Sequence, residues 1–254
     1  MNEAVIRVEH AAKDFPAVRR GPGGLKRAVL HPRETWRTRR SGRHRVFADL
    51  SLEVRRGESL GIIGRNGGGK STLLGLMAGV LRPSTGRVEV RGRISPLLEL
   101  GAGFHPELSG EENAVLNGVL LGRTRREITR RLPAILAFAE LGEYIREPIR
   151  IYSSGMLARL GFAVIAELDP EILLVDEVLA VGDAAFHVKC LEKVRAFRRA
   201  GVTMVFVSHA LENIREFCDR AIWLDGGIRR MGPPGEVIAE YLASSAAAPG
   251  VGHG

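Results

Sequence analysis

Short apolar segments recur along this chain in two kinds of pattern. Where apolar and polar residues alternate, or where a brief apolar run stands between turn residues, the pattern predicts a β-strand. Such segments cover residues 5–8, 47–54, 59–63, 87–90, 94–100, 172–175, 202–207 and 221–224. Several of these runs are apolar throughout, which is typical of strands buried on both faces of a sheet.

Other segments carry apolar residues at every third or fourth position, which predicts helices. They cover residues 73–80, 111–121, 125–141, 156–167, 184–200, 211–217 and 235–242. Pro133 lies inside the third of these, and we expect it to split that helix because proline cannot donate a backbone hydrogen bond. Strands that alternate with helices predict an α/β core with a mainly parallel sheet. The helical stretch at about 105–168 interrupts this alternation and predicts an inserted helical subdomain.

The turn between the predicted strand 59–63 and the next helix matches the phosphate-binding loop pattern. Its residues are Gly64, Arg65, Asn66, Gly67, Gly68, Gly69, Lys70, Ser71 and Thr72. The N–H groups of such a turn, together with the N-terminus of the following helix, face a bound anion. We expect Lys70 to reach the β- and γ-phosphates of a nucleotide and the Ser71 hydroxyl to ligate magnesium.

A second buried strand, 172–175, is followed by the two carboxylates Asp176 and Glu177. A carboxylate in this position can hold a magnesium ion, and its neighbour can direct a water molecule at the terminal phosphate. Together with the phosphate-binding loop, this pair predicts a protein that binds ATP or GTP and hydrolyses it.

The chain has 254 residues, of which 45% are hydrophobic, and this is enough for one core or for two small subdomains that share one. We expect a single domain over residues 1–243 and a disordered tail over 244–254. No apolar run approaches the roughly 18 residues of a membrane helix, and the N-terminus lacks a signal-peptide layout. These features predict a cytosolic protein with at most peripheral membrane contact. Cys190 and Cys218 are expected to be buried free thiols.

The net charge of +8 is concentrated in one segment, at about residues 16–46. This segment contains ten cationic side chains and one acid, Glu34, which gives +9. Its glycines and prolines predict a loop with at most one short helix. Two interpretations stay open: a solvated insertion in an arginine-rich chain, or a surface that contacts anionic lipid head groups or an anionic substrate.

A further segment, from Tyr152 to Met156, precedes the predicted helix 156–167 and lies upstream of Asp176. Its serines and glycine at a helix N-terminus can form an anion site. The segment resembles the signature of ATP-binding-cassette (ABC) proteins, with Tyr in place of Leu, Ser154 in place of Gly and Met156 in place of Gln. The resemblance extends over nearly the whole chain.

This resemblance implies a P-loop NTPase fold of the ABC type, with a mainly parallel core sheet, an antiparallel β subdomain and an inserted helical subdomain. It also implies roles for residues at the matching positions. Ser153, Ser154 and Gly155 would bind the γ-phosphate of ATP held by the opposite subunit, and Asp183 would lie in the loop that crosses to that subunit.

For the nucleotide itself, the resemblance implies that Asp176 holds magnesium through water and that Glu177 polarises the attacking water. His209 matches the switch histidine that contacts the γ-phosphate. Phe15 is a candidate for the aromatic side chain that stacks on adenine, with a core phenylalanine as the alternative. Where the family usually has a glutamine, this chain has Leu100 beside Glu99. Glu99 could serve as a polar ligand near magnesium, or it could be a surface acid.

Several segments resemble the ATPases of polysaccharide exporters more specifically, namely 97–110, 112–113, 116–118, 152–156 and 176–183. The resemblance implies a subunit that hydrolyses ATP to export O-antigen, capsule or teichoic-acid chains linked to a lipid carrier. Such a subunit would need ATP and Mg²⁺, act as a homodimer on a dimeric membrane permease, and lie at the cytoplasmic face of the bacterial inner membrane. It would not bind nucleic acid.

Three other functions remain as alternatives. The cargo of the transporter could be a lipid or a drug, although segment 101–118 favours polysaccharide. A soluble cassette ATPase acting on DNA or ribosomes usually has a coiled-coil insertion or a second cassette, and this sequence shows neither. The signature segment argues against a P-loop kinase.

Overall fold

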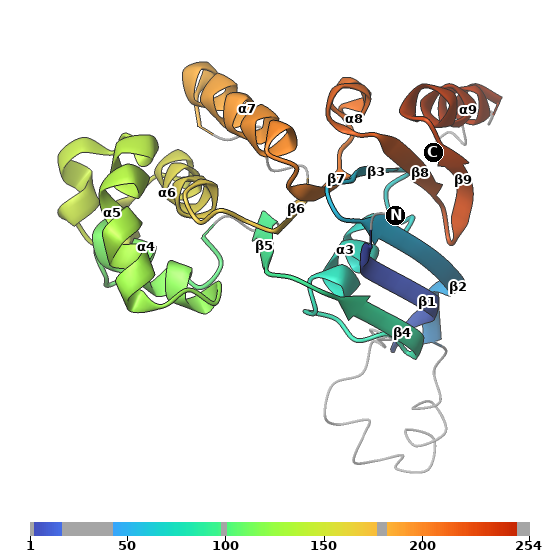
Figure 1. Cartoon of the computed structure of the whole chain (residues 1–254), viewed down its shortest axis with the longest axis horizontal. Helices are drawn as coiled ribbons and strands as arrows, with labels where there is room; N and C mark the ends of the chain where they lie inside the picture. The colour runs from blue at the N-terminus through green and yellow to red at the C-terminus, as the bar shows by residue number, and fades with distance from the viewer. Residues whose placement is uncertain (1–2, 17–42, 98–100, 177–181, 248–254) are drawn as a thin grey trace, which may run out of the picture.

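The computed structural model describes residues 3–16, 43–97, 101–176 and 182–247. Figure 1 shows a group of helices at one end of the molecule, a small antiparallel sheet at the other, and a larger sheet between them. This arrangement confirms the predicted α/β fold with a mainly parallel core, an antiparallel β subdomain and a helical subdomain.

The larger sheet has six strands in the order β5-β6-β7-β3-β8-β9. The first five are parallel, and β9 pairs with β8 in the antiparallel direction. The strands are β3 (Ser59–Ile63), β5 (Ile94–Leu97), β6 (Ile172–Asp176), β7 (Thr203–Val207), β8 (Arg220–Leu224) and β9 (Ile228–Gly232). Strand β3 lies between β7 and β8, near the middle of the sheet, and it is buried along its whole length.

The smaller sheet is antiparallel, with strand order β2-β1-β4. Its strands are β1 (Ala4–Pro16), β2 (Arg43–Arg55) and β4 (Thr85–Val90). Apolar side chains of this sheet pack with helix α3 (Lys70–Met77) against one face of the larger sheet. The phosphate-binding loop, which joins β3 to α3, therefore lies where the two sheets meet.

The opposite face of the larger sheet is covered by helices (Figure 1). These are α6 (Ser154–Ala166), α7 (Ala184–Arg199), α8 (Leu211–Phe217) and α9 (Pro234–Ala247). Successive residues of a strand point to opposite faces. Leu173 and Val175 thus pack against the helices, whereas Ile172 and Leu174 pack against α3 and the small sheet.

The helical subdomain consists of α4 (Gly110–Leu120), α5 (Arg125–Ala139) and α6, joined by the short 3-10 helices η1 (Gly142–Arg146) and η2 (Ile149–Ile151). Helices α4 and α5 each begin with a capping box, formed by Ser109 with Glu112 and by Thr124 with Glu127. These boxes satisfy backbone N–H groups that a helix start leaves unpaired. The subdomain has its own apolar core.

Two buried asparagines anchor the segment that leads into α4. Asn113 accepts a hydrogen bond from the backbone N–H of His105 and donates to the carbonyls of His105, Leu108 and Ser109. Asn117 donates to the carbonyl of Ala102 at 2.9 Å. An unpaired buried amide costs about 1–3 kcal/mol, so these asparagines favour one conformation of the segment. Asn113 and Asn117 thus stabilise much of segment 101–118, which resembles polysaccharide exporters in sequence.

Several local predictions were wrong. Pro133 lies inside a continuous helix α5, because Ile128 on one side of it and Ile135 and Ala139 on the other are all buried in the same core. Helix α9 extends to Ala247, four residues into the predicted disordered tail. Strand β9 was not predicted, because two adjacent arginines interrupt any apolar run or alternation in it, and its pairing with β8 defines it.

The predicted loop at 16–46 extends too far at its C-terminal end. Arg43 to Val46 belong to strand β2, where Phe15 pairs with His44 and Asp14 pairs with Arg45. The Arg45 Nε donates to Asp14 Oδ1 at 3.0 Å, and this hydrogen bond raises the pKa of the guanidinium. Arg43 and Arg45 thus belong to the sheet, and residues 17–42 of the basic segment lie outside the described residues.

The two cysteines, Cys190 and Cys218, are buried free thiols, as predicted. Burial raises the pKa of each thiol to about 12. Across the residues that the structure describes, no helix combines the length and apolarity needed to cross a bilayer.

Candidate active site

The register of the parallel strands brings the predicted site residues to one edge of the larger sheet. Val207, at the end of β7, pairs with Ile62 of β3 on one side and with Asp176 of β6 on the other. The chain then continues from β3 into the phosphate-binding loop and from β7 into His209. Ligands of open parallel sheets bind at this carboxyl edge, so the sheet itself assembles the site.

The phosphate-binding loop requires glycine at positions where the backbone turns sharply beside other chain segments. Gly64 has φ of 152°, and a Cβ atom there would lie 2.1 Å from the Leu224 carbonyl oxygen. Gly69 has φ of 98°, and its Cβ would lie 2.8 Å from Val46. Gly69 is also the N-cap of α3 and provides no side-chain acceptor. The first N–H groups of α3 are therefore left for an anion to accept.

Lys70 is the first residue of α3, and only 6% of its surface is exposed. Its Nζ donates to the carbonyls of Gly64 at 2.9 Å and Arg65 at 3.0 Å, so the side chain folds back over the loop. The N–H of Gly68 also donates to the Arg65 carbonyl. The ammonium group is thus held at the mouth of the loop, where a phosphate would neutralise it.

A cleft of about 800 Å³ opens beside the loop. Its lining comes from three parts of the fold and consists of Phe15, His44, Val46, Asn66, Gly67, Gly69, Lys70, Ser71, Thr72, Asp176 and His209. The volume is within the range of small-molecule and cofactor sites. The predicted phosphate loop, magnesium ligands Ser71 and Asp176, switch histidine and adenine-stacking aromatic therefore share one cleft. Gly64, Arg65 and Gly68 shape the loop behind it.

One wall of the cleft is formed by the ends of β1 and β2. Phe15 and His44 are directly opposite each other in the antiparallel pair, so their side chains share a face, and Val46 shares it too. Phe15 is half-buried and outside the apolar cores, which favours a ligand-contacting role over a core role. No local pattern in the sequence marks His44, because the strand pairing that places it opposite Phe15 spans the basic segment.

The other wall bears the groups that suit a hard cation. Mg²⁺ prefers oxygen ligands and usually binds through one or two carboxylates together with substrate phosphates. The Ser71 hydroxyl and the Asp176 carboxylate both line the cleft and fit this requirement. Among the described residues, no group of three or more His, Cys, Asp or Glu side chains could hold a metal by itself. Glu99 and Glu177, the other predicted acids, lie outside the described residues.

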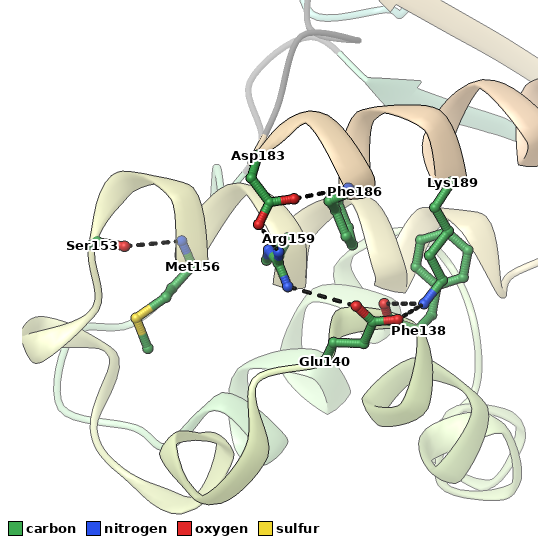
Figure 2. Close-up of polar contacts among 8 residues, drawn as sticks. All are labelled: Phe138, Glu140, Ser153, Met156, Arg159, Asp183, Phe186 and Lys189. Atoms are coloured by element: carbon green, nitrogen blue, oxygen red, sulfur yellow. Dashed lines mark hydrogen bonds and ion pairs between the residues drawn. The ribbon is translucent and has the colours of Figure 1, made fainter.

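The signature segment faces a different direction. The Ser153 hydroxyl accepts a hydrogen bond from the Met156 N–H at 3.2 Å and caps α6 (Figure 2). Ser153 and Ser154 are exposed, and Gly155 is half-buried. In the part of the chain that the structure describes, none of the three lines the phosphate cleft.

Tyr152 explains why the signature of this chain begins with an aromatic residue. Its side chain is buried, and its hydroxyl donates to the Tyr144 carbonyl at 2.5 Å. A Cβ at Gly110 would lie 2.4 Å from that hydroxyl, so a glycine is needed there. Burial raises the pKa of Tyr152. The side chain thereby fixes the start of α6 to the rest of the helical subdomain.

Asp183 is the N-cap of α7, and its Oδ1 accepts a hydrogen bond from the Phe186 N–H at 2.9 Å. Its Oδ2 forms an ion pair with Arg159 of α6 at 2.6 Å (Figure 2). The hydrogen bond from Phe186 and the charge of Arg159 both lower the pKa of this carboxyl. No local pattern in the sequence marks Arg159 either, since the contact between α6 and α7 depends on the tertiary fold.

The comparisons with known proteins agree with this geometry. A protein-family model described as "ABC transporter" matches residues 47–180, which include the phosphate-binding loop, Asp176 and the signature segment. The match covers more than half of the chain.

Relatives with similar sequences are named as exporter subunits. The O-antigen export system ATP-binding protein RfbB of Klebsiella pneumoniae is 46% identical over 243 residues, covering 95% of this chain and 99% of that protein. RfbB of Myxococcus xanthus is 54% identical over 76% of this chain and 44% of that protein. The teichoic acids export ATP-binding protein TagH of Listeria monocytogenes is 43% identical over 77% of this chain and 58% of that protein.

Solved structures share the fold at lower sequence identity. An ATP-binding subunit of an ABC transporter superposes with a TM-score of 0.72 at 20% identity, covering 95% of this chain and 99% of that one. A dimeric ATP-binding cassette in a post-hydrolysis state, bound to ADP and Pi, has a TM-score of 0.69 at 21% identity over 90% of this chain and 98% of that one.

Proposed function

Because this chain belongs to the ABC transporter family of ATPases, we propose that it is the ATP-hydrolysing subunit that powers export of a lipid-linked polysaccharide through a membrane permease. The cargo would be an O-antigen, a capsule chain or a teichoic acid. Two relatives that support this cargo are the RfbB protein of Klebsiella pneumoniae and the TagH protein of Listeria monocytogenes, whose names state O-antigen and teichoic-acid export.

One observation carries the proposal for hydrolysis: the phosphate-binding loop, Asp176 and His209 line a single cleft. Phosphoryl transfer to water depends mainly on positioning and on neutralising phosphate charge. Lys70 and the N–H groups of α3 would bind the phosphates, and His209 would contact the γ-phosphate. Glu177, which follows Asp176 in the sequence, would accept a proton from the attacking water.

Ser71 and Asp176 would hold Mg²⁺ in this cleft, with Glu99 as a further candidate. When bound, the ion neutralises charge on the phosphate oxygens. Phe15 and His44 would bind the base of the nucleotide, because they pair at the end of the small sheet and line the same cleft as the phosphate-binding loop.

We further propose that the active form is a homodimer with ATP at the interface. The N-terminus of α6, at Ser153 to Gly155, has two exposed serines, lies outside the cleft of its own subunit and would bind the γ-phosphate held by the partner. Asp183 would face the same interface. A dimeric permease would bind this pair at the cytoplasmic face of the bacterial inner membrane, and closure and opening of the ATPase dimer would drive the permease.

The cargo can be tested in the native host. We expect deletion of the gene to remove the polysaccharide from the cell surface and to accumulate its lipid-linked form inside, as measured by gel electrophoresis and immunoblotting of separated membranes. The wild-type gene should restore export. Lys70→Ala should fail to restore it, whereas Lys193→Met, in the second half of α7, should succeed.

A normal surface polysaccharide in the deletion strain, with a changed lipid or drug content, would contradict the polysaccharide proposal. Recovery of the subunit with a multi-span membrane protein would support a transporter. Recovery with ribosomes or DNA alone would contradict it.

A further inference from the structure

We propose that Glu140 and Lys189 are positioning residues that act through Arg159 to hold Asp183, so that the start of α6 and the start of α7 move as one unit. The dimerisation part of this inference rests on the proposed function, because both segments would face the partner subunit. The four residues, called here the Arg159 network, connect the end of α5, helix α6 and helix α7 (Figure 2).

Arg159 is the centre of the network. Its side chain is 18% exposed. The Nη2 atom lies 2.6 Å from Asp183 Oδ2, and the Nη1 atom lies 3.8 Å from Glu140 Oε2. The guanidinium also lies over the ring of Phe186, 4.8 Å from the ring centroid. Arg159 thus contacts two carboxylates that belong to different helices and are far apart in the sequence.

Glu140 and Lys189 close the other side of the network. The Lys189 Nζ donates to Glu140 Oε1 at 2.5 Å and to the Phe138 carbonyl at 3.0 Å, at the end of α5. Glu140 is the C-cap of α5 and has φ of 53°, a left-handed conformation that is uncommon for residues other than glycine. The hydrogen bond from Lys189, followed by its charge, lowers the pKa of Glu140.

The network rests on an aromatic cluster formed by one residue from each of the three helices. Phe138, Phe162 and Phe186 lie with ring centroids between 5.8 and 6.3 Å apart. Lys189 lies over Phe138 at 4.5 Å, as Arg159 lies over Phe186. The rings shield the cations Arg159 and Lys189, whose side chains are 18% and 31% exposed, whereas the carboxylates of Glu140 and Asp183 are more than half exposed and are screened by water.

The placement of these contacts supports a positioning role. Asp183 is adjacent to the first turn of α7, and Ser153, at the start of the helix that carries Arg159, belongs to the signature segment. A second ion pair joins Lys193, about one turn further along α7 than Lys189, to Glu167 at the C-cap of α6, with a distance of 2.8 Å. It has similar chemistry and no contact with Asp183, so it provides a matched control.

The first experiment measures local opening in the isolated subunit by hydrogen exchange. The Phe186 amide bonds to Asp183 Oδ1, so it reports directly on how firmly Asp183 is held. We expect Lys189→Met and Glu140→Gln to increase its exchange rate by about five- to tenfold. Lys193→Met should leave it unchanged, and the conservative Lys189→Arg should restore most of the protection.

The second experiment measures ATP-driven dimerisation by analytical ultracentrifugation in a Glu177→Gln background. Lys189→Met should weaken dimerisation by about five- to tenfold, with ATP affinity of the monomer unchanged. Glu140→Gln should have no further effect when Asp183→Asn is already present, because the network would act through that carboxylate.

The outcomes separate this inference from the proposed function. Unchanged exchange at Phe186 in both Lys189→Met and Glu140→Gln would overturn the inference, whether or not the protein dimerises. Equal effects of Lys193→Met and Lys189→Met would also overturn it, by showing a general structural role. If the Glu177→Gln protein shows no ATP-driven dimer, the homodimer proposal fails, while the exchange result still decides the role of the network.

Discussion

The N-termini of α3 and α6 both point backbone N–H groups toward a possible anion, yet they are built differently. Helix α3 begins after Gly69, without a side-chain cap, and its first residue, Lys70, is buried against the loop. Helix α6 begins after Ser153, whose hydroxyl already satisfies the Met156 N–H, and the surrounding residues are largely exposed.

This difference shows which site one subunit can complete. At α3, the loop, the lysine and a wall from the small sheet enclose a cleft, so the phosphate site is formed within the chain. At α6, the helix start is already capped by Ser153, its serines are exposed, and it lies outside that cleft. We therefore expect α3 to determine the affinity of the monomer for ATP and α6 to matter only when a second subunit is present.

The largest effect should come from Glu177→Gln, since the amide cannot accept a proton from water. Loss of a general base typically lowers the rate by about 10²–10⁴-fold. ATP binding should be retained, and an ATP-bound dimer should accumulate. In that dimer the N-terminus of α3 from one subunit and the N-terminus of α6 from the other would contact the same nucleotide. Phosphate release and ultracentrifugation measure these two quantities. Turnover near the wild-type rate would remove Glu177 from this role.

Lys70→Ala should weaken ATP binding to the isolated subunit by about 10- to 100-fold. The reason is that a hydrogen bond to a charged group is worth about 1.5–3 kcal/mol. Titration with a fluorescent ATP analogue measures the affinity, and a thermal melt checks that the loop still folds. Ser153→Ala is the matched control at the other helix start, and it should leave monomer affinity unchanged. Equal losses of ATP affinity in Lys70→Ala and Ser153→Ala would contradict the different roles proposed for the N-termini of α3 and α6.

Gly155→Leu should weaken ATP-driven dimerisation by about tenfold or more, because a bulky side chain would fill the surface that meets the partner. Monomer stability should change little, because among the described residues a Cβ at Gly155 would meet only the Ser153 hydroxyl, at 3.8 Å. Sedimentation with and without ATP provides the test. A loss of monomer affinity without loss of dimerisation would show that the signature segment has been misassigned.

The smallest effect should come from His44→Ala, which removes part of the wall beside Phe15. We expect ATP affinity to fall by about two- to tenfold, as for an aromatic contact worth about 0.5–1.5 kcal/mol. Arg43→Ala is the control, because successive side chains of a strand point to opposite faces. A comparison of ATP with GTP would show whether His44 contributes to base selection. Identical behaviour of the two variants would exclude His44 from the nucleotide site.

The sequence by itself determined the features that depend on neighbouring residues. The glycines around Lys70, the apolar strand before them and the acids after the strand 172–175 are local patterns, and the structure assembles Lys70, Asp176 and His209 in one cleft. Their assembly was also predictable, because the carboxyl ends of parallel strands share an edge.

Only the tertiary structure decided the features that depend on segments far apart in the chain. Pro133 remains inside a helix because the packing on both sides outweighs the lost hydrogen bond, and β9 is a strand because β8 pairs with it. His44 meets Phe15 across the basic segment, and Arg159 meets Asp183 and Glu140 from separate helices. Local patterns carry no information about which distant side chains will share a surface, because packing and strand register determine those contacts.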